Sequence, residues 1–474
     1  MKRASWLTVG LVSLIIVNMF LIFYLFNSQA RYEFAQQLRQ NRKSNPVVQR
    51  EVEDPYYHLV DLDLMDLLGP TSVIVRDQGK LYRVPKPSIW QDILDQEDST
   101  PLLSLVDNTP IIDPVGLAHI LDQDHVQLLF FTKFSIPLLS DLVEVPKDQS
   151  TQFAVNRIVF AKDDQGSVYL VDSEKKSYLQ ARLTDAKRME AILGQMDATH
   201  TDQIEVVEYP INRDSVYLPK SALLSPSQVF TLEKNPENLL VHPIFGSENF
   251  DITQPDVKNE RILQNYNTSL RINDTTRMMT LTKSRNQGTS SLNQDGNLMT
   301  QKEKVTKALD FLKKFTYWDK GVFYAGENNN QFVFRRALEG IPIFSAPEIE
   351  EADYGVTRMT LGEQASRLEL GRLQMPLLML GVHVPDQSKQ VKLESADEIS
   401  QILEDEGLKF SQFNQILIGM EWQKEMENLK KVILVPKWYF QVGNQFYSID
   451  QVRDGTVRAA LKEVSGGSSD LTAM

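Results

Sequence analysis

The sequence of 474 residues contains no cysteine. This absence excludes disulfide bonds, thiolate nucleophiles, iron–sulfur clusters and cysteine-ligated zinc sites. Domains of ordinary size are held by their own apolar cores and need no disulfides, even in an oxidising compartment. The lack of cysteine is therefore compatible with a location outside the cell.

Recognisable catalytic and metal-binding motifs are also missing. No HExxH, GxSxG, GxGxxG or GxxxxGK[ST] pattern occurs, and the histidines are scattered along the chain: His58, His119, His125, His200, His242 and His383. Ser173-Glu174-Lys175-Lys176 matches SxxK, but no KTG accompanies it and a solvated turn is the better interpretation. Asp61, Asp63 and Asp66 lack the Gly and Glu that an EF-hand loop requires. The sequence thus predicts no catalytic residue, no metal site and no cofactor.

Charge is absent from one long segment near the amino terminus. Residues 4–30 carry no Asp, Glu, Lys or Arg, and their apolar part runs from Trp6 to Phe26. A helix over residues 6–26 is about 30 Å long, which matches the hydrocarbon thickness of a bilayer. Ser28-Gln29-Ala30 resembles a signal-peptidase site, but the apolar run is longer than that of a signal peptide. We therefore predict an uncleaved transmembrane helix.

The orientation of this helix is less clearly encoded. Lys2 and Arg3 precede it, whereas Arg31, Arg39, Arg42 and Lys43 follow it, so the positive-inside rule gives no clean answer. A short tail beside a large domain is the usual plan of a bacterial signal anchor. We predict a cytoplasmic tail at residues 1–5 and an extracellular region after the helix.

One face of the predicted transmembrane helix carries small and polar residues. Gly10, Leu14 and Asn18 are spaced four apart and share that face. Glycine permits close helix approach, and an amide in the bilayer needs a hydrogen-bond partner. These three residues are the candidate transmembrane interaction face, although Asn18 as a tolerated residue is an open alternative.

The net charge of −13 is unevenly distributed. Residues 1–50 contain seven Lys or Arg and one Glu, a net charge of +6, so the remaining residues carry −19. An acidic body disfavours nucleic acid as a partner, because such binding requires Lys and Arg to neutralise phosphates.

The pattern of the outer region predicts an α+β fold with several domains. We expect a stalk at residues 27–50, a mixed α/β domain at 51–205, a central α+β domain at 206–345, a C-terminal α+β domain at 346–464 and a disordered tail at 465–474. Within the first domain, hairpins are expected at 72–84 and 155–171, and a helix at 185–196. Residues 206–265 are rich in Pro and Asn, which predicts a long connection with a short helix near Pro236–Leu240.

The last two predicted domains share one order of elements, a ββαββ repeat. In the first copy, strands at 269–272 and 278–281 precede a helix that Thr300 and Glu303 cap, and strands at 322–325 and 331–335 follow. In the second copy, strands at 356–361 and 366–370 precede a helix capped by Ser395 and Glu398, and strands at 415–420 and 431–439 follow. An acidic run at Glu348, Glu350, Glu351 and Asp353 separates the copies and reads as a linker. Trp438 and Tyr439 read as core residues.

Four features of the C-terminal half resemble the YycH (WalH) family of low-GC Gram-positive bacteria. They are Asn273-Asp274-Thr275-Thr276-Arg277, Gly340-Ile341-Pro342-Ile343-Phe344, the capped helix from Ser395, and Leu434-Val435-Pro436-Lys437-Trp438. The order of tail, single transmembrane helix and large outer region is similar as well.

The resemblance implies a non-enzymatic regulator of a YycG/WalK-like sensor histidine kinase that controls cell-wall metabolism. It also implies a single-pass YycI-like partner and contacts between transmembrane helices, and it supplies no catalytic residues. Two alternatives stay open at this point, a membrane-anchored cell-wall enzyme and an envelope scaffold protein.

Overall fold

A computed structural model describes most of the chain after residue 62. The described residues are 63–84, 90, 101–144, 153–162, 166–184, 203–234, 240–241, 244–245, 250–253, 259–283, 299–315, 321–328, 331–347, 352–364, 367–424 and 430–466. They belong to one compact unit, Val60–Met474. The predicted cytoplasmic tail at 1–5, the transmembrane helix at 6–26, the stalk at 27–50 and the helix at 185–196 lie outside these residues.

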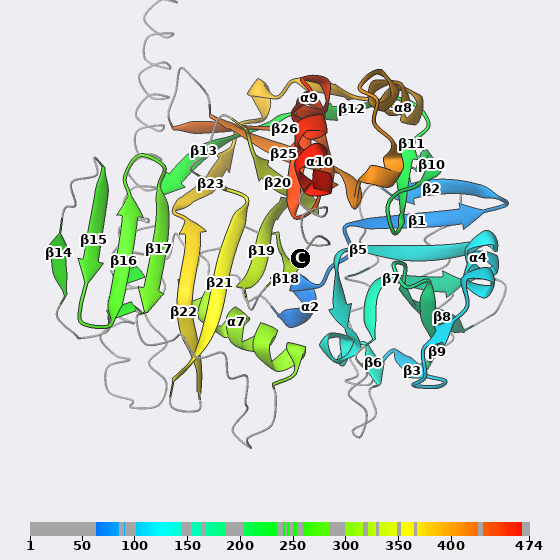
Figure 1. The fold of residues 1–474 in the computed structure, drawn as a ribbon, viewed down its shortest axis with the longest axis horizontal. Helices are drawn as coiled ribbons and strands as arrows, with labels where there is room; N and C mark the ends of the chain where they lie inside the picture. Colours follow the sequence, from blue (N-terminus) through cyan, green and yellow to red (C-terminus); the bar gives the residue numbers. More distant parts are fainter. Residues whose placement is uncertain are drawn as a thin grey trace, which may run out of the picture. The chain divides into compact units, whose positions relative to one another are not determined.

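The first part of this unit forms a large sheet that is antiparallel except for the β3–β6 pair (Figure 1, blue to cyan, with β10 and β11 in green). Among the described residues it has eleven strands, in the order β11-β10-β2-β1-β5-β7-β8-β9-β3-β6, with β4 beside β9. The strands are β1 (Ser72–Asp77), β2 (Lys80–Val84), β3 (Leu103–Leu105), β4 (Ile111–Ile112), β5 (His125–Ser135), β6 (Val143–Glu144), β7 (Ala154–Ala161), β8 (Ser167–Asp172), β9 (Ser177–Leu183), β10 (Ile204–Pro210) and β11 (Ser215–Pro219).

The two hairpins predicted in this region are confirmed. In the first, Asp77 pairs with Lys80, and both Gln78 and Gly79 have positive φ, which suits a tight turn between twisted strands. In the second, β7 pairs with β8. β10 pairs with both β2 and β11, so this sheet extends to Pro219, beyond the predicted domain boundary at residue 205.

The rest of the unit builds a second sheet. Among the described residues it has fourteen strands, in the order β14-β15-β16-β17-β22-β21-β19-β20-β25-β26-β13-β23, with β18 beside β19 and β27 beside β26. The strands are β13 (Gln228–Lys234), β14 (Asp251–Thr253), β15 (Glu260–Gln264), β16 (Thr268–Asn273), β17 (Met278–Lys283), β18 (Val322–Asn328), β19 (Gln331–Leu338), β20 (Ile341–Ser345), β21 (Val356–Gln364), β22 (Arg367–Pro376), β23 (Leu378–His383), β25 (Gln415–Lys424), β26 (Lys431–Val442) and β27 (Gln445–Ser448). A separate ribbon pairs β12 (Leu223–Pro226) with β24 (Gln390–Leu393).

The long connection predicted for residues 206–265 is wrong, because that segment contributes β11 to β15. Two of its prolines, Pro219 and Pro226, stand at strand ends, where a missing N–H costs no ladder hydrogen bond. Of the predicted short helix near Pro236–Leu240, only Leu240 is a described residue, and it is helical.

Every element of the predicted ββαββ order occurs, but the two copies do not form separate sheets. β16–β17 of the first copy lies beside β22–β21 of the second, which lies beside β19 of the first, and β20 links this group to β25–β26. The strands of the two copies therefore interleave within one sheet, and the structural repeat stays a prediction.

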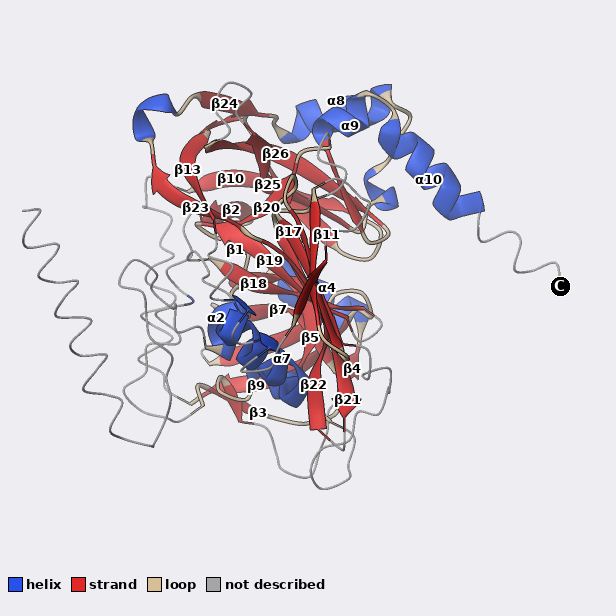
Figure 2. Ribbon diagram, turned by 90° about the vertical axis from the view of Figure 1, so that its left-hand side faces the viewer, coloured by secondary structure: helices blue, strands red, loops and turns tan. Residues whose placement is uncertain are grey.

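Helices pack against the sheets at a few places. They are α2 (Leu64–Leu67), α4 (Pro114–Asp122), α7 (Gln301–Phe315), α8 (Ala396–Asp405), α9 (Ile449–Arg453) and α10 (Thr456–Gly466). Figure 2 shows α8, α9 and α10 grouped together, and α2 beside α7 away from them. Because α10 ends at Gly466, the tail predicted from residue 465 begins two residues too early.

Both predicted capping boxes are confirmed. At α7, the backbone N–H of Thr300 donates to Glu303 (2.7 Å) and that of Glu303 donates to the Thr300 hydroxyl (3.2 Å). At α8, Ser395 and Glu398 exchange the same two bonds. Both helices bury the apolar face that the sequence predicts, with Val305, Ala308, Leu309 and Leu312 on α7 and Ile399 and Leu403 on α8.

One apolar core runs through both sheets. It includes Leu128 and Ile158 of the first sheet, Leu281 and Leu373 of the second, and Leu309 of α7. A second core lies under α8, α9 and α10 and holds Trp438 and Phe440. The opposite face of the first sheet carries smaller apolar clusters, which include Val159 and Ile74, together with the buried polar side chains of Gln127 and Arg157.

Candidate functional site

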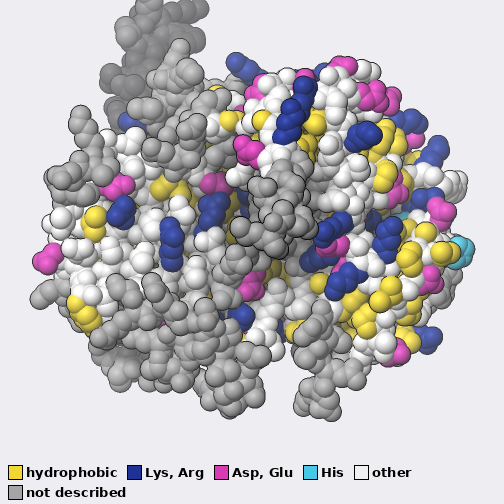
Figure 3. Space-filling model, in the orientation of Figure 1, with side chains coloured by type: hydrophobic (Ala, Val, Ile, Leu, Met, Phe, Trp, Pro, Cys, Tyr) yellow, Lys and Arg dark blue, Asp and Glu magenta, His cyan; other side chains and the backbone are white. Residues whose placement is uncertain are grey.

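A cleft with a volume of 1310 Å³ opens where the two sheets meet. β5, β7 and the segment 211–217 line it from the first sheet, and β18, β19, β25 and β26 line it from the second. Figure 3 shows Lys and Arg side chains gathered near the middle of the molecule, where the sheets adjoin. This cleft is the candidate functional site.

Phe131 of β5 joins the two walls of the cleft. The register of β5 against β7 shifts between Leu129 and Phe134, and this irregularity lies where β5 reaches the second sheet. The Phe131 ring lies 4.8 Å from that of Phe323 and 5.6 Å from that of Phe446, and its carbonyl oxygen accepts a bond from Gln415 (3.4 Å). An irregular strand thus ties the sheets together.

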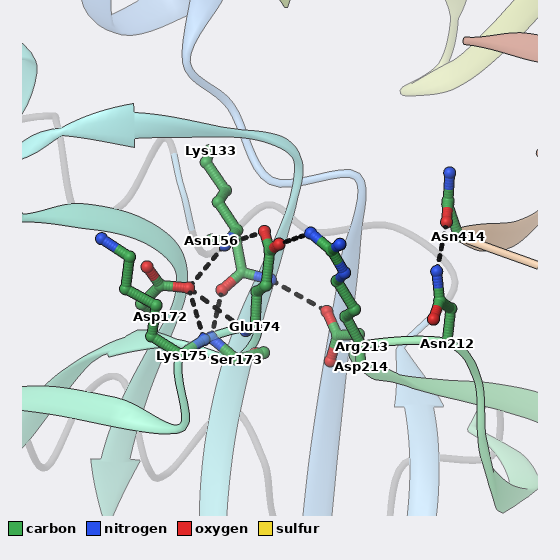
Figure 4. Close-up of polar contacts among 10 residues, drawn as sticks. All are labelled: Lys133, Asn156, Asp172, Ser173, Glu174, Lys175, Asn212, Arg213, Asp214 and Asn414. Atoms are coloured by element: carbon green, nitrogen blue, oxygen red, sulfur yellow. Dashed lines mark hydrogen bonds and ion pairs between the residues drawn. The ribbon is translucent and has the colours of Figure 1, made fainter. Parts of the chain in front are cut away.

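A second tie lies between the loop before β11 and the loop before β25. The Asn212 backbone N–H donates to the carbonyl oxygen of Phe413 (3.0 Å), and its side chain donates to that of Asn414 (2.9 Å; Figure 4). Close by, the rings of Tyr209 and Phe410 stack at 4.6 Å. Hydrogen bonds and a ring contact between described residues therefore join the two walls of the cleft.

The wall from the first sheet carries a buried polar network around Arg157. Its side chain is 3% exposed and pairs with Asp214. It also donates to Gln127 (3.1 Å) and to the hydroxyl of Tyr217 (3.0 Å). Burial by itself lowers the pKa of Arg157, but Asp214 and Tyr217 outweigh it, so the pKa is raised and the guanidinium stays charged.

The β8–β9 hairpin places further charges at the rim of the same wall. Lys133 lies 2.5 Å from Asp172 and 2.6 Å from Glu174, and Arg213 also pairs with Glu174 (Figure 4). Asp172 accepts the backbone N–H groups of Glu174 and Lys175, which closes the turn. The SxxK match is therefore a turn, as predicted.

The wall from the second sheet is built around Arg335 of β19. This residue is 7% exposed, and its Nη1 donates to the carbonyl oxygen of Ile343 (2.7 Å). The guanidinium lies over the ring of Phe344 at 4.3 Å and that of Phe446 at 5.6 Å. Burial lowers the pKa of Arg335, and Asp353 opposes that effect.

Other residues singled out in the sequence have structural roles. Asp63 and Asp66 cap α2, with the Asp63 backbone N–H donating to Asp66 (2.8 Å). Trp438 and Tyr439 are buried, as predicted. Asp353 lies 3.4 Å from Arg358, and the rest of its acidic run lies outside the described residues.

The predicted transmembrane face lies outside the described residues. Gly10, Leu14 and Asn18 are not among them. Within the described ranges, no helix is long and apolar enough to cross a membrane. The predicted interaction face therefore stays a prediction.

The cleft offers no metal chemistry among the described residues. They contain no group of three or more His, Asp or Glu side chains arranged to hold a metal ion. None of their histidines lines the cleft, and the cleft carboxylates at Glu174 and Asp214 are held in ion pairs. The arrangement is suited to binding through fixed guanidinium and amide groups.

No sequence pattern pointed to this cleft. Arg157, Asp214 and Arg335 come from three distant segments, and none belongs to a known motif. One feature of the sequence points to part of the cleft. Arg335-Arg336 interrupts an otherwise apolar strand, and charged residues in a buried strand require partners.

Comparison with known proteins supplies the family. The model for the YycH protein N-terminal domain matches residues 5–201, and the model for its C-terminal domain matches residues 245–456. Among solved structures, YycH from Bacillus subtilis has a TM-score of 0.64 at 16% sequence identity, covering 82% of this chain and 97% of that chain. No curated protein matches the chain.

The two family models together cover most of both sheets but leave out residues 202–244, which include β10 to β13 and the 211–217 segment of the cleft wall; the shared fold is the mixed α+β fold of the solved structure. The chain therefore belongs to the YycH family, a regulatory, non-catalytic family, and this membership supports a role as a regulator of the YycG/WalK system.

Proposed function

We propose that this chain is a membrane-anchored regulator that acts by contact with a YycG/WalK-like sensor kinase and a YycI-like partner. Residues 6–26 cross the cell membrane, the tail at 1–5 is cytoplasmic, and the two-sheet unit is extracellular. The observation that carries the proposal is the order of the chain, in which an uncharged run of bilayer length precedes a unit that matches the YycH models.

The transmembrane contact is assigned to Gly10, Leu14 and Asn18. A partner changes a two-state kinase only by binding its two states unequally. A tenfold change in the ratio of states requires a difference of about 1.4 kcal/mol, which a few contacts between helices supply. The extracellular unit holds the second partner and keeps the transmembrane helix in register with the kinase.

The test is affinity capture of the full chain from membranes with mass spectrometry as the readout. The wild-type chain is expected to capture a sensor histidine kinase and a second single-pass protein. The double variant Gly10→Ile, Asn18→Leu is expected to lower kinase recovery several-fold, because it removes both the close approach and the amide hydrogen bond.

A matched control changes the opposite side of the same helix. Val12→Ile together with Ile16→Val exchanges two apolar side chains, so it preserves hydrophobicity and leaves the interaction face unchanged. Kinase recovery should then equal that of the wild type. Equal recovery with the Gly10→Ile, Asn18→Leu variant removes this face from the proposal, and a wild-type chain that captures no kinase removes the regulator.

A further inference from the structure

The charge of the cleft is opposite in sign to that of the chain. Among the described residues its lining contains six basic side chains and three acidic ones, whereas the whole chain has 50 basic and 63 acidic residues. The basic residues are Arg83, Lys133, Arg157, Arg213, Arg335 and Arg358. A local excess of positive charge in a cleft focuses the electrostatic field there and favours the binding of anions.

The acidic residues of the cleft are already occupied. Glu174 pairs with Lys133 and Arg213, Asp214 pairs with Arg157, and Glu327 faces Lys304. These pairs neutralise the charges of the rim and of the Arg157 network. Among the described residues, Arg335 and Arg83 have no carboxylate within ion-pair distance, and they line opposite walls.

Arg335 has the stronger geometry of the two. It is more than nine-tenths buried, its Nε has no hydrogen-bond partner among the described residues, and its Nη1 donates to Ile343. Phe344 and Phe446 fix the plane of the guanidinium. A charged group with unsatisfied donors is costly to bury unless an anion completes it.

Arg83 supplies a second cation without an ion-pair partner among the described residues, and it is half-buried. It lies on β2, where its Cα pairs with those of Ile74 and Ile204, and it shares the face of the first sheet that carries Tyr217 and Arg157. Its side chain makes no hydrogen bond with the described residues. The lining of the cleft also contains side-chain amides, such as Gln331, Gln441 and Asn444.

We propose that the cleft binds an extended, hydroxyl-rich anion whose carboxylate or phosphate groups pair with Arg335 and Arg83. A volume of 1310 Å³ exceeds what one small anion fills, and two cations on opposite walls require anionic groups at two points. Side-chain amides donate to and accept from hydroxyl groups, so the segment between the anionic groups is polar and uncharged. This site is independent of the transmembrane contact proposed above.

Titration calorimetry on the purified full-length chain tests this assignment. The probes are phosphorylated maltohexaose, oligogalacturonate of six units, and unmodified maltohexaose. At least one of the two anionic probes is expected to bind and to lose affinity as salt rises, whereas maltohexaose should not bind. Which anionic probe binds more tightly distinguishes phosphate from carboxylate as the recognised group.

Three variants sharpen the result. Arg335→Gln and Arg83→Gln are each expected to weaken binding at least about tenfold, because each removes charge-assisted hydrogen bonds. Arg335→Lys keeps the charge and should restore affinity only in part. Arg271→Gln is the matched control, since this arginine lies on β16 with a 57% exposed side chain and does not line the cleft.

Several outcomes would overturn the assignment. They are no binding of either anionic probe at millimolar concentration, equal binding of maltohexaose, or full affinity in folded Arg335→Gln protein. Folding of each variant is checked by circular dichroism. If Arg335→Gln does not fold, the Arg83→Gln and Arg335→Lys proteins decide the question by the same criteria. A failure here would leave kinase capture unaffected, so it is separable from a failure of the regulator proposal.

Discussion

Arg157 and Arg335 line opposite walls of one cleft and are both almost fully buried, yet their surroundings differ. Arg157 has a carboxylate, a hydroxyl and an amide oxygen from its own chain. Arg335 has a carbonyl oxygen and two aromatic rings but no carboxylate within ion-pair distance among the described residues, and the Nε of each arginine lacks a partner among them. The first wall therefore pairs its buried cation with a carboxylate of its own, whereas the buried cation of the second wall has no such partner among the described residues.

This difference separates a structural charge from a binding charge. Removing one member of a buried ion-paired network leaves its partners buried and unpaired. Such a residue therefore contributes to stability. Removing a buried charge that has no ion-pair partner leaves no other charge unpaired. The burial of such a charge itself costs free energy when the cleft is empty. The two arginines should then respond to the same substitution in different ways.

The largest effect is expected from Arg157→Met. The substitution leaves Asp214 and Gln127 without their cationic partner inside the protein, and the free energy of unfolding should fall by about 3–5 kcal/mol. Urea unfolding of the purified full-length chain, followed by tryptophan fluorescence, measures the change. Arg271→Met, on the exposed side of β16, is the control and should alter stability by less than about 0.5 kcal/mol.

A loss below about 1 kcal/mol for Arg157→Met would mean that the network is not complete as described. In that case the first wall would resemble the second, and the contrast between them would disappear.

Turn and helix-cap residues predicted many of the strands and helices that position these walls. Gln78-Gly79 predicted the β1–β2 turn, and Thr300 with Glu303 predicted the start of α7. Such signals depend on residues within four positions of one another. They are therefore readable from a single sequence.

Features that depend on distant residues could not be predicted in this way. The Arg157–Asp214 pair joins residues 57 positions apart, and β20 pairs with β25 in parallel although they are far apart in the sequence. The interleaving of the two ββαββ copies and the cleft itself arise only from such pairings. β11 to β15 were missed because short strands resemble a connection, and β11 and β12 also end in proline.

A second prediction concerns the polar face of the first sheet at low pH. His125 begins β5, is 1% exposed, and shares this face with Gln127. Its Nδ1 lies 2.8 Å from the carbonyl oxygen of Gln123, while its Nε2 has no partner among the described residues. Burial lowers the pKa of His125 from 6.5 to about 4, so the folded protein keeps it neutral.

The sign of the effect follows from proton binding. Between pH 6.5 and about 4, the unfolded chain protonates His125 and the folded chain does not, so stability falls as the pH is lowered. The contribution of this residue amounts to about 3 kcal/mol at pH 4 relative to pH 7. Urea titrations of the wild type and of His125→Gln at several pH values isolate it, because the carboxylates contribute equally to both proteins. Parallel pH profiles of the two proteins would contradict the prediction.

The smallest effect on stability is expected from Arg335→Met, and its smallness is the informative result. The substitution removes the bond to Ile343 and the contact with Phe344, each contributing about 1 kcal/mol or less. It also removes the cost of burying a guanidinium that has no carboxylate partner among the described residues, and a methionine fills most of the same volume. We therefore expect a change within about 1 kcal/mol, of either sign, in urea unfolding without added ligand. A loss comparable to that of Arg157→Met would show that Arg335 is held by its own protein as firmly as Arg157 is, and the second wall would then be structural rather than open to a ligand.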